Sequence, residues 1–251
     1  MAGTAVLGRL SWQVATVVEL VDETARARSV VLDPPAWPGH RAGQHVDVRL
    51  TAEDGYQAQR SYSIASAPED EHLVLTVERL EDGEVSPYLV DELRPGDDLE
   101  LRGPVGGYFV WEETFGGPLL LVAGGSGIVP LRAMLRHHRA LGSDVHARLL
   151  YSARSLDDVI YRDELMSLAA RDGDGIDVHF TLTRTQPEGW SGYARRIDRE
   201  LLGEIAWPPS TNPLVYICGP TAFVEAAAEA LVALGHDPGM VRTERFGATG
   251  G

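Results

Sequence analysis

The chain has 251 residues, of which 44% are apolar and 24% charged, and its formal net charge is −15 at pH 7. This length and composition suffice for two modest globular domains. Because the phosphate backbone of a nucleic acid would repel such an acidic chain, we expect no nucleic-acid binding. A single cysteine, Cys218, excludes an internal disulfide and a self-contained iron-sulfur cluster held by four thiolates.

The sequence contains no segment suited to membrane insertion. The first residues, MAGTAVLGRLSWQV, lack a charged stretch followed by an apolar core. No run approaches the roughly 18 to 20 apolar residues that cross a bilayer. We therefore expect a cytoplasmic, monomeric protein without membrane contact, whose partners are small molecules or other proteins.

Short β-like runs divided by Pro, Gly and acidic turns occupy the chain up to about residue 110. In order they are WQVATVVEL, ARSVVL, HVDVRL, RSYSIA, HLVLTVERL and DDLELRG. Short strands separated by such turn residues are typical of an antiparallel barrel. Within it, SPYLVDEL at 86–93 predicts a short helix. WEETFGG at 111–117 is the expected joint, so the first domain is predicted to span residues 1–112.

Strands and helices alternate from Pro118 onward. The pairs are PLLLVA and PLRAMLRHHRAL, VHARLLYSA and YRDELMSLAAR, IDVHFTLT and IDRELLGEI, and PLVYICG and TAFVEAAAEALVAL, with MVRTERF as a closing strand. This alternation implies βαβ units in a parallel sheet. The second domain is therefore predicted to be an α/β domain spanning residues 113–251.

The predicted strand AQRSYSIAS at 58–66 is polar where a core-covering strand would alternate apolar and polar residues. Arg60, Ser61, Tyr62 and Ser63 place a cation, a phenol and two hydroxyls on one extended segment. A solvated edge strand would explain this pattern, and so would a ligand site.

A glycine-rich turn, VAGGSGIVPLRAM, joins the first α/β strand to its helix. Gly124, Gly125 and Gly127 are suited to bring backbone against a pyrophosphate at a helix N-terminus. The match to a dinucleotide fingerprint is imperfect because Pro130 stands where a third small residue is usual. Proline is tolerated in a first helical turn, so the helix start is retained. A tight turn without a ligand is the alternative.

Three further motifs accompany these two segments. LEDGEVSPYL and GDDLELRGPVGGYF lie between RSYS and the glycine turn, and YICGPTAF follows the glycine turn. Together with RSYS and the glycine turn, in this order, they make the sequence resemble the ferredoxin-NADP reductase family. The resemblance runs from the barrel to the final ERF and covers nearly the whole chain.

The resemblance implies FAD along the polar strand. Arg60 would neutralise the flavin pyrophosphate, Tyr62 would lie against the isoalloxazine ring, and Ser63 would hydrogen-bond near N5. A guanidinium is well suited to the first role. Ser61 belongs to the same segment. Gly83, Val85 and Ser86 would face the pyrophosphate, which favours FAD over FMN.

For the pyridine nucleotide, the resemblance implies two groups of residues. Gly125, Gly127 and Ile128 would contact the pyrophosphate, and Cys218, Gly219 and Pro220 would lie near the nicotinamide. Lone cysteines are more often inert core residues. The CGP motif favours a functional role, in which Cys218 shapes the geometry of hydride transfer and is not a covalent nucleophile.

Residues after the third α/β strand suggest NADPH as the preferred nucleotide. Thr183 and Arg184 stand where a 2′-phosphate would be bound, and Arg154 ends the preceding strand. An acidic residue at this place would favour NADH. Asp157 and Asp158, which could bind an unphosphorylated ribose, are evidence for NADH.

The end of the last strand matches a family pattern of a glutamate followed by an aromatic over the flavin. Glu244 and Phe246 fit it, with Glu244 near the nicotinamide. Five further residues, GATGG, follow Phe246, so its carboxylate is not a chain terminus. The alternative is that Phe246 simply covers the core.

The resemblance therefore implies a flavoprotein reductase with an FAD-binding antiparallel β-barrel followed by an α/β domain. Electrons would pass from NAD(P)H through FAD to a separate ferredoxin, haem enzyme or molybdenum oxidoreductase. Two other classes remain open: a free-flavin or ferric reductase, and a non-catalytic nucleotide-binding regulatory module. We expect no metal site, because the adjacent His137 and His138 point in different directions on a helix.

Overall fold

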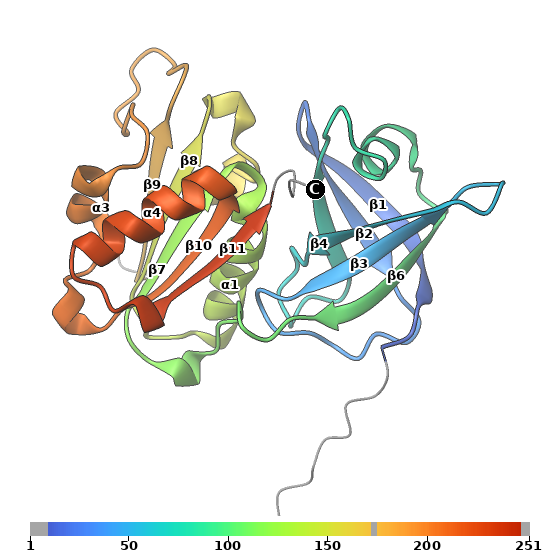
Figure 1. The fold of residues 1–251 in the computed structure, drawn as a ribbon, viewed down its shortest axis with the longest axis horizontal. Helices are drawn as coiled ribbons and strands as arrows, with labels where there is room; N and C mark the ends of the chain where they lie inside the picture. Colours follow the sequence, from blue (N-terminus) through green and yellow to red (C-terminus); the bar gives the residue numbers. More distant parts are fainter. Residues whose placement is uncertain (1–9, 172–174, 247–251) are drawn as a thin grey trace, which may run out of the picture.

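The computed structural model describes residues 10–171 and 175–246. Figure 1 shows two lobes side by side, an antiparallel sheet built from the first half of the chain and a helix-covered parallel sheet built from the second. The predicted order of an antiparallel domain followed by an α/β domain is confirmed.

The antiparallel sheet contains six strands in the order β4-β3-β6-β1-β2-β5. Their bounds are β1 Gln13–Thr24, β2 Ala27–Asp33, β3 His45–Thr51, β4 Gln57–Ser63, β5 Leu73–Glu78 and β6 Asp98–Val105. The two edge strands meet at a bridge between Ile64 and Leu75, which brings the ends of the sheet together as the barrel prediction requires. Alternate strand residues such as Val46 and Val48 are fully buried inside it. The predicted short helix is present at Tyr88–Glu92.

The parallel sheet has the order β11-β10-β7-β8-β9. Its strands are β7 Leu119–Gly124, β8 Ala147–Ala153, β9 Ile176–Leu182, β10 Leu214–Pro220 and β11 Val241–Phe246. The helices are α1 Ile128–Leu141, α2 Arg162–Ala169, α3 Arg199–Ile205 and α4 Thr221–Ala233.

Helices cover both faces of this sheet, which explains why its strands are apolar without alternation. Leu119 and Leu121 of β7 pack in the cluster that contains α1 and α2 residues. Leu120 and Val122, on the opposite face, pack in the cluster that contains α3 and α4 residues. In Figure 1, α3 and α4 lie on the near face of the sheet and α1 on the far one.

The segment between β6 and β7 is tied to the second sheet. The Tyr216 hydroxyl donates to the Val110 carbonyl at 2.6 Å, and the Arg242 guanidinium donates to the same oxygen at 2.9 Å. Trp111 is fully buried. These contacts fix the start of β7 and with it the edge of the sheet that faces the barrel.

Helix α1 also binds the barrel directly. Arg132 donates to the Ala65 carbonyl at 3.2 Å, and Arg136 pairs with Asp70 at 2.8 Å. His137 contacts Glu69 at 2.7 Å. The loop that follows β4 is thus anchored to the helix that follows the glycine turn. None of the helices in residues 10–171 and 175–246 has the length and apolarity needed to cross a bilayer.

Candidate functional site

The ends of four strands converge where the two lobes meet. In the barrel, His45 of β3 pairs in register with Ser63 of β4. In the parallel sheet, Cys218 of β10 pairs in register with Glu244 of β11. His45 Nδ1 lies 4.0 Å from Glu244 Oε1, so the two pairs are brought together across the lobes. The predicted site residues Ser63, Cys218 and Glu244 therefore belong to one region.

Burial sets the electrostatics of this region. It raises the pKa of Glu244 to about 7 and lowers the pKa of His45, an effect that the Asp47 carboxylate opposes. Burial also raises the pKa of the Cys218 thiol, and the neighbouring Glu244 raises it further. Cys218 therefore stays a neutral thiol at physiological pH, which is consistent with a shaping role and not with nucleophilic attack.

The glycine turn after β7 packs directly on the end of β10. A Cβ placed on Gly127 would lie 2.0 Å from the Cys218 carbonyl oxygen, so only glycine fits there. Gly125 has a φ of +55°, in the left-handed region that glycine adopts most readily. Ile128 then begins α1. Backbone amides at a helix start and a glycine cradle without side chains are the groups that a dinucleotide pyrophosphate requires.

Gly219 and Pro220 complete this edge. A Cβ on Gly219 would lie 2.7 Å from the Phe223 ring, so glycine also allows α4 to approach here. Pro220 pairs in register with Phe246, the last residue of β11. Phe246 is 36% exposed. The GATGG segment lies outside the described residues.

Arg60 lies on the exposed edge strand β4, beside the loop that holds Gly83, Val85 and Ser86. One of its terminal nitrogens donates to Glu84 Oε2 at 2.8 Å, and the other donates to the Gln59 carbonyl at 2.7 Å. A Cβ on Gly83 would lie 2.8 Å from Ser86 Oγ. A cation beside a tight glycine loop is a donor set that fits a flavin pyrophosphate.

The other residues of that loop contribute differently. Val85 and Ser86 are buried, and Ser86 Oγ accepts a hydrogen bond from the Leu80 amide at 3.1 Å. The Val85 side chain lies in the barrel core. These two residues hold the loop in shape, so their backbone is the part available to a ligand.

Tyr62 and Ser61 point to opposite sides of β4, as alternation along a strand requires. Tyr62 is half-buried against the barrel core, and burial raises its pKa, so the phenol stays neutral. Ser61 Oγ instead donates to Asp47 at 2.7 Å, and Asp47 also binds Arg102 at 2.6 Å. Ser61 therefore braces β4 against its neighbours on the side away from Arg60.

Thr183 and Arg184 follow β9 and are bonded to the end of β8. The Arg184 amide donates to the Arg154 carbonyl at 2.9 Å, which places two exposed arginines side by side along the backbone. The Thr183 hydroxyl donates to the Ala153 carbonyl at 3.2 Å. Since a phosphate accepts hydrogen bonds, the two arginines are better placed than Thr183 to bind one.

Three residues near this site were not predicted from the sequence. His45 and Glu84 are described above, and the hydroxyl of Tyr56 donates to Glu84 Oε1 at 2.6 Å. His45 begins the predicted strand HVDVRL, and Glu84 lies in the motif LEDGEVSPYL, but neither residue was assigned a role. Tyr56 lies outside all the motifs described above.

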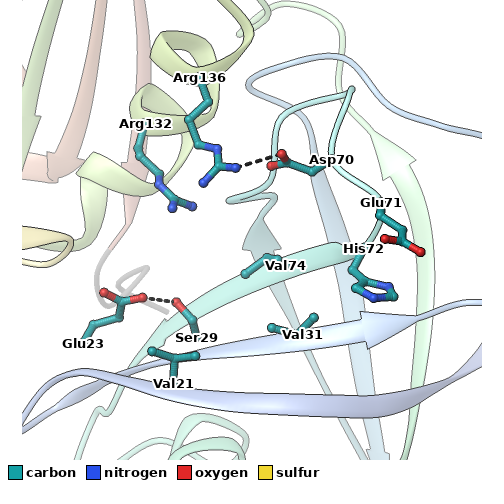
Figure 2. Close-up of a pocket in the computed structure, with 10 residues that line it drawn as sticks. All are labelled: Val21, Glu23, Ser29, Val31, Asp70, Glu71, His72, Val74, Arg132 and Arg136. Carbon is teal, nitrogen blue, oxygen red and sulfur yellow. Dashed lines mark hydrogen bonds and ion pairs between the residues drawn. The ribbon is translucent and has the colours of Figure 1, made fainter. Parts of the chain in front are cut away.

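A separate cavity of about 360 Å³ lies between α1 and the barrel strands. Figure 2 shows Arg132 and Arg136 extending from α1 over apolar residues of the barrel, with Arg136 paired to Asp70 and Ser29 bonded to Glu23. Arg132 is paired with Glu164 at 2.6 Å. The lining of this cavity contains none of the predicted site residues, and both of its arginines have acidic partners.

Comparison with known proteins gives the same division of the chain. Residues 13–110 match the oxidoreductase FAD-binding domain, and residues 121–229 match the oxidoreductase NAD-binding domain. Ferredoxin-NADP reductase B of Sorangium cellulosum is 39% identical over 214 residues, which cover 82% of this chain and 84% of that protein.

A second relative is longer than this chain. The glycine betaine monooxygenase reductase subunit of Chromohalobacter salexigens is 31% identical over 237 residues, which cover 92% of this chain but 63% of that protein. The chain thus spans less than two thirds of the length of this relative.

Solved structures agree with the fold. The FAD/NAD-binding domain of nitric oxide dioxygenase from Vibrio cholerae superposes with a TM-score of 0.83 at 26% identity, covering 94% of this chain and 98% of that one. The cytochrome P450 reductase GcoB of Amycolatopsis has a TM-score of 0.82 at 27% identity, and the match covers 97% of this chain and 73% of that one. The chain therefore belongs to the ferredoxin-NADP reductase family of flavoprotein oxidoreductases, with an FAD-binding barrel followed by a domain that binds a pyridine nucleotide.

Proposed function

We propose that this protein oxidises NADPH and passes the electrons through FAD to a separate redox protein. The observation that carries the proposal is the meeting of His45 and Ser63 from the barrel with Cys218 and Glu244 from the parallel sheet. Bound FAD supplies the chemistry, because flavins accept a hydride from a reduced nucleotide and release electrons singly. The role of the protein is to align the two cofactors and exclude water.

On the barrel side, Arg60 would bind the flavin pyrophosphate together with the backbone of Gly83, Val85 and Ser86. Tyr62 would lie along the isoalloxazine ring, and Ser63 would hydrogen-bond near N5. The half-buried, neutral phenol of Tyr62 supports this placement, because a ring held against the core presents a fixed apolar face. Ser61 would act indirectly, by holding β4 in register through Asp47.

On the nucleotide side, the amides of Gly125, Gly127 and Ile128 would bind the nucleotide pyrophosphate. Cys218, Gly219 and Pro220 would form the wall beside the nicotinamide. Glu244, whose pKa is about 7, would exchange a proton at the same wall under physiological conditions. Phe246 would cover the position that the nicotinamide must reach.

The preference for NADPH over NADH rests on Arg184 and Arg154. Both are exposed and adjacent, whereas the acidic residues nearby already have partners: Asp157 lies 3.5 Å from Arg162, and Asp158 accepts from Ser155 at 2.6 Å. Arg184→Ala should therefore lower the ratio of kcat/KM for NADPH over NADH by about tenfold, the loss of one charge-assisted contact. Arg199→Ala, an exposed arginine on α3, is the control. An unchanged ratio in Arg184→Ala would contradict this assignment.

The electron acceptor is proposed from the kinds of protein that the relatives serve by name: a ferredoxin, a haem protein such as cytochrome b5, or a monooxygenase component. A molybdenum oxidoreductase is a further possibility of the same class. The domain boundary near residues 112 and 113 and a monomeric, cytoplasmic protein also belong to the proposal.

Steady-state assays with different acceptors test this function. The FAD-loaded protein should reduce a ferredoxin or a haem protein with NADPH faster than it reduces free flavin or a ferric chelate. Rapid reduction of free flavin without any protein acceptor would favour a free-flavin or ferric reductase. A protein that binds nucleotide but oxidises it with none of these acceptors would favour a regulatory module.

A further inference from the structure

A chain of buried hydroxyl groups crosses from the parallel-sheet lobe into the barrel. The Tyr161 hydroxyl, just before α2, donates to Thr76 Oγ1 on β5. Thr76 Oγ1 lies 2.8 Å from Ser29 Oγ on β2, and Ser29 donates to Glu23 Oε1 at 2.6 Å. Tyr161, Thr76 and Ser29 are all buried. The two lobes are therefore joined by directional hydrogen bonds as well as by apolar contacts.

The direction of each bond in this chain follows from its last acceptor. A hydroxyl has one proton, and that of Ser29 is donated to Glu23, so Ser29 must accept from Thr76. The Thr76 proton is then in use, so the Thr76 oxygen must accept from Tyr161. Burial raises the pKa of the Tyr161 phenol, which keeps the donated proton in place. A different orientation of the lobes would leave buried hydroxyls without partners, which is costly.

The backbone of Tyr161 adopts a conformation that an aromatic residue rarely takes. Its φ is 60°, in the left-handed region that is unfavourable for a residue with a Cβ. Buried core residues of the parallel-sheet lobe surround it and hold it there. Strained residues of this kind cluster where a side chain has a specific task. The task of Tyr161 is indicated by its hydroxyl, which reaches the other lobe.

Arg132 of α1 adds a second contact between the lobes at the same place. Its guanidinium lies 4.3 Å from the centre of the Tyr161 ring, and it donates to the Ala65 carbonyl of the barrel at 3.2 Å. Glu164 on α2 pairs with the same guanidinium at 2.6 Å. Tyr161 and Arg132 therefore act together, and they bind β5 through Thr76 and the segment after β4 through Ala65.

Both of these barrel segments lead to the proposed site. Ala65 lies two residues after Ser63. Thr76 lies two residues before Glu78, the last residue of β5, so both side chains are on one face of the strand. A Cβ on Gly125 would lie 4.0 Å from Glu78 Oε2, so β5 reaches the glycine turn. A change at Thr76 and Ala65 would therefore move the flavin strand relative to the nucleotide turn.

We propose that Tyr161 is a positioning residue, which fixes the orientation of the two lobes through Thr76 and thereby the alignment of the nicotinamide with the flavin. The inference rests on the proposed function, because hydride transfer is the step that needs this alignment. A displacement on the order of 1 Å can cost about a hundredfold in rate. A purely structural Tyr161 would affect stability and leave this step unchanged.

The test is anaerobic reduction of the FAD-loaded variants by saturating NADPH, with the limiting rate read from the flavin absorbance band. Tyr161→Phe keeps the ring over Arg132 and removes only the hydroxyl, so this rate should fall about tenfold. The flavin–nicotinamide charge-transfer band should weaken, whereas the affinities for FAD and for oxidised nucleotide should stay within about twofold of the wild type. Thr76→Val breaks the same chain from the barrel and should reproduce these changes.

Tyr151→Phe is the matched control. Tyr151 is buried in the same core cluster as Tyr161, but its hydroxyl accepts from the Ile160 amide at 3.2 Å, within one lobe. The control should lose a similar amount of stability in chemical denaturation and keep the wild-type limiting rate. Combining Tyr161→Phe with Thr76→Val should be no slower than either single change, because both break one chain.

The outcomes separate the positioning role from the proposed function. An unchanged limiting rate in Tyr161→Phe, an equal fall in Tyr151→Phe, or a fall that weaker nucleotide binding explains overturns the positioning role alone. If Tyr161→Phe does not fold, Thr76→Val decides by the same criteria. A wild-type flavin that neither nucleotide reduces overturns the proposed function together with this inference.

Discussion

The two halves of the proposed site differ in the groups that they present to a ligand. On the barrel side, the groups suited to a ligand include side chains on an exposed edge strand, with Arg60 held by Glu84, beside the backbone of the loop that contains Val85 and Ser86. On the nucleotide side they are backbone atoms packed so closely that a Cβ on Gly127 would meet the Cys218 carbonyl at 2.0 Å. The difference implies that substitutions on the barrel side change ligand affinity, whereas those on the nucleotide side change the fold.

The largest expected effect is on the backbone-built side. Gly127→Ala should lower the free energy of unfolding by about 3 kcal/mol or more, because the turn after β7 must move away from β10. Chemical denaturation measures this. Gly203→Ala is the matched control: its Cβ would lie 3.5 Å from Leu234, an ordinary contact, and alanine is favoured in a helix. Equal stability of Gly127→Ala and the wild type would remove the basis of the comparison.

On the side built from side chains, Arg60→Ala should weaken FAD binding by roughly 1.5 to 3 kcal/mol through loss of a charge-assisted contact. Its stability should change by less than about 0.5 kcal/mol, because its ion pair with Glu84 is exposed. Titration of the flavin-free protein measures the first quantity and denaturation the second. Arg28→Ala, which breaks a pair with Asp22 on β1, controls for loss of charge. A folding defect without an affinity change would contradict the contrast.

Glu244 is an exception that sharpens the comparison, because it is a side chain on the backbone-built side. The folded protein keeps its proton up to about pH 7, whereas the ordinary pKa is 4.5. Stability should therefore fall as pH rises through this window, since the unfolded chain releases the proton first.

Glu244→Gln removes the ionisable group and with it this loss of stability at high pH. At pH 8 the variant should be more stable than the wild type by about 1 to 2 kcal/mol, after screening through the partly exposed side chain, and near pH 4.5 the difference should vanish. The lowered pKa of His45 leaves that neighbour neutral at pH 8, so it does not compensate. Glu229→Gln on α4 is the control for the change of residue. A stability difference that does not vary with pH would show that Glu244 is ionised throughout.

The smallest effect is expected at Phe246, at the exposed end of β11. Phe246→Ser should bind oxidised nucleotide a few times more tightly, show a stronger flavin–nicotinamide charge-transfer band and turn over more slowly as product release slows. Spectral titration and steady-state kinetics measure these quantities. If the variant is only less stable, with the same affinity and spectrum, Phe246 covers the core and does not gate the site.

Local sequence patterns were sufficient for the fold. Runs such as PLLLVA are apolar because helices cover both faces of the sheet, and the turns between strands carry their own glycine and proline signals. The glycine turn was also predicted from residues adjacent in sequence, and it joins β7 to α1. The segment RSYS was likewise predicted as part of a strand, and it lies in β4.

Contacts between distant segments could not be predicted in this way. His45 meets Glu244, and Glu84 meets Arg60 and Tyr56, only because the strands fold together. The opposite orientation of Ser61 and Arg60, by contrast, follows from strand alternation and was open to prediction. The hydroxyl of Thr183 is occupied by a carbonyl on a neighbouring strand, which no local pattern reveals.

The account is tested most directly by a single-turnover experiment without oxygen. The FAD-loaded protein is mixed with NADPH, and the flavin absorbance band is followed over time. We expect complete bleaching by one equivalent of NADPH, slower bleaching by NADH, and recovery of the band when a one-electron protein acceptor is added. A flavin that stays oxidised in the presence of either nucleotide would contradict it.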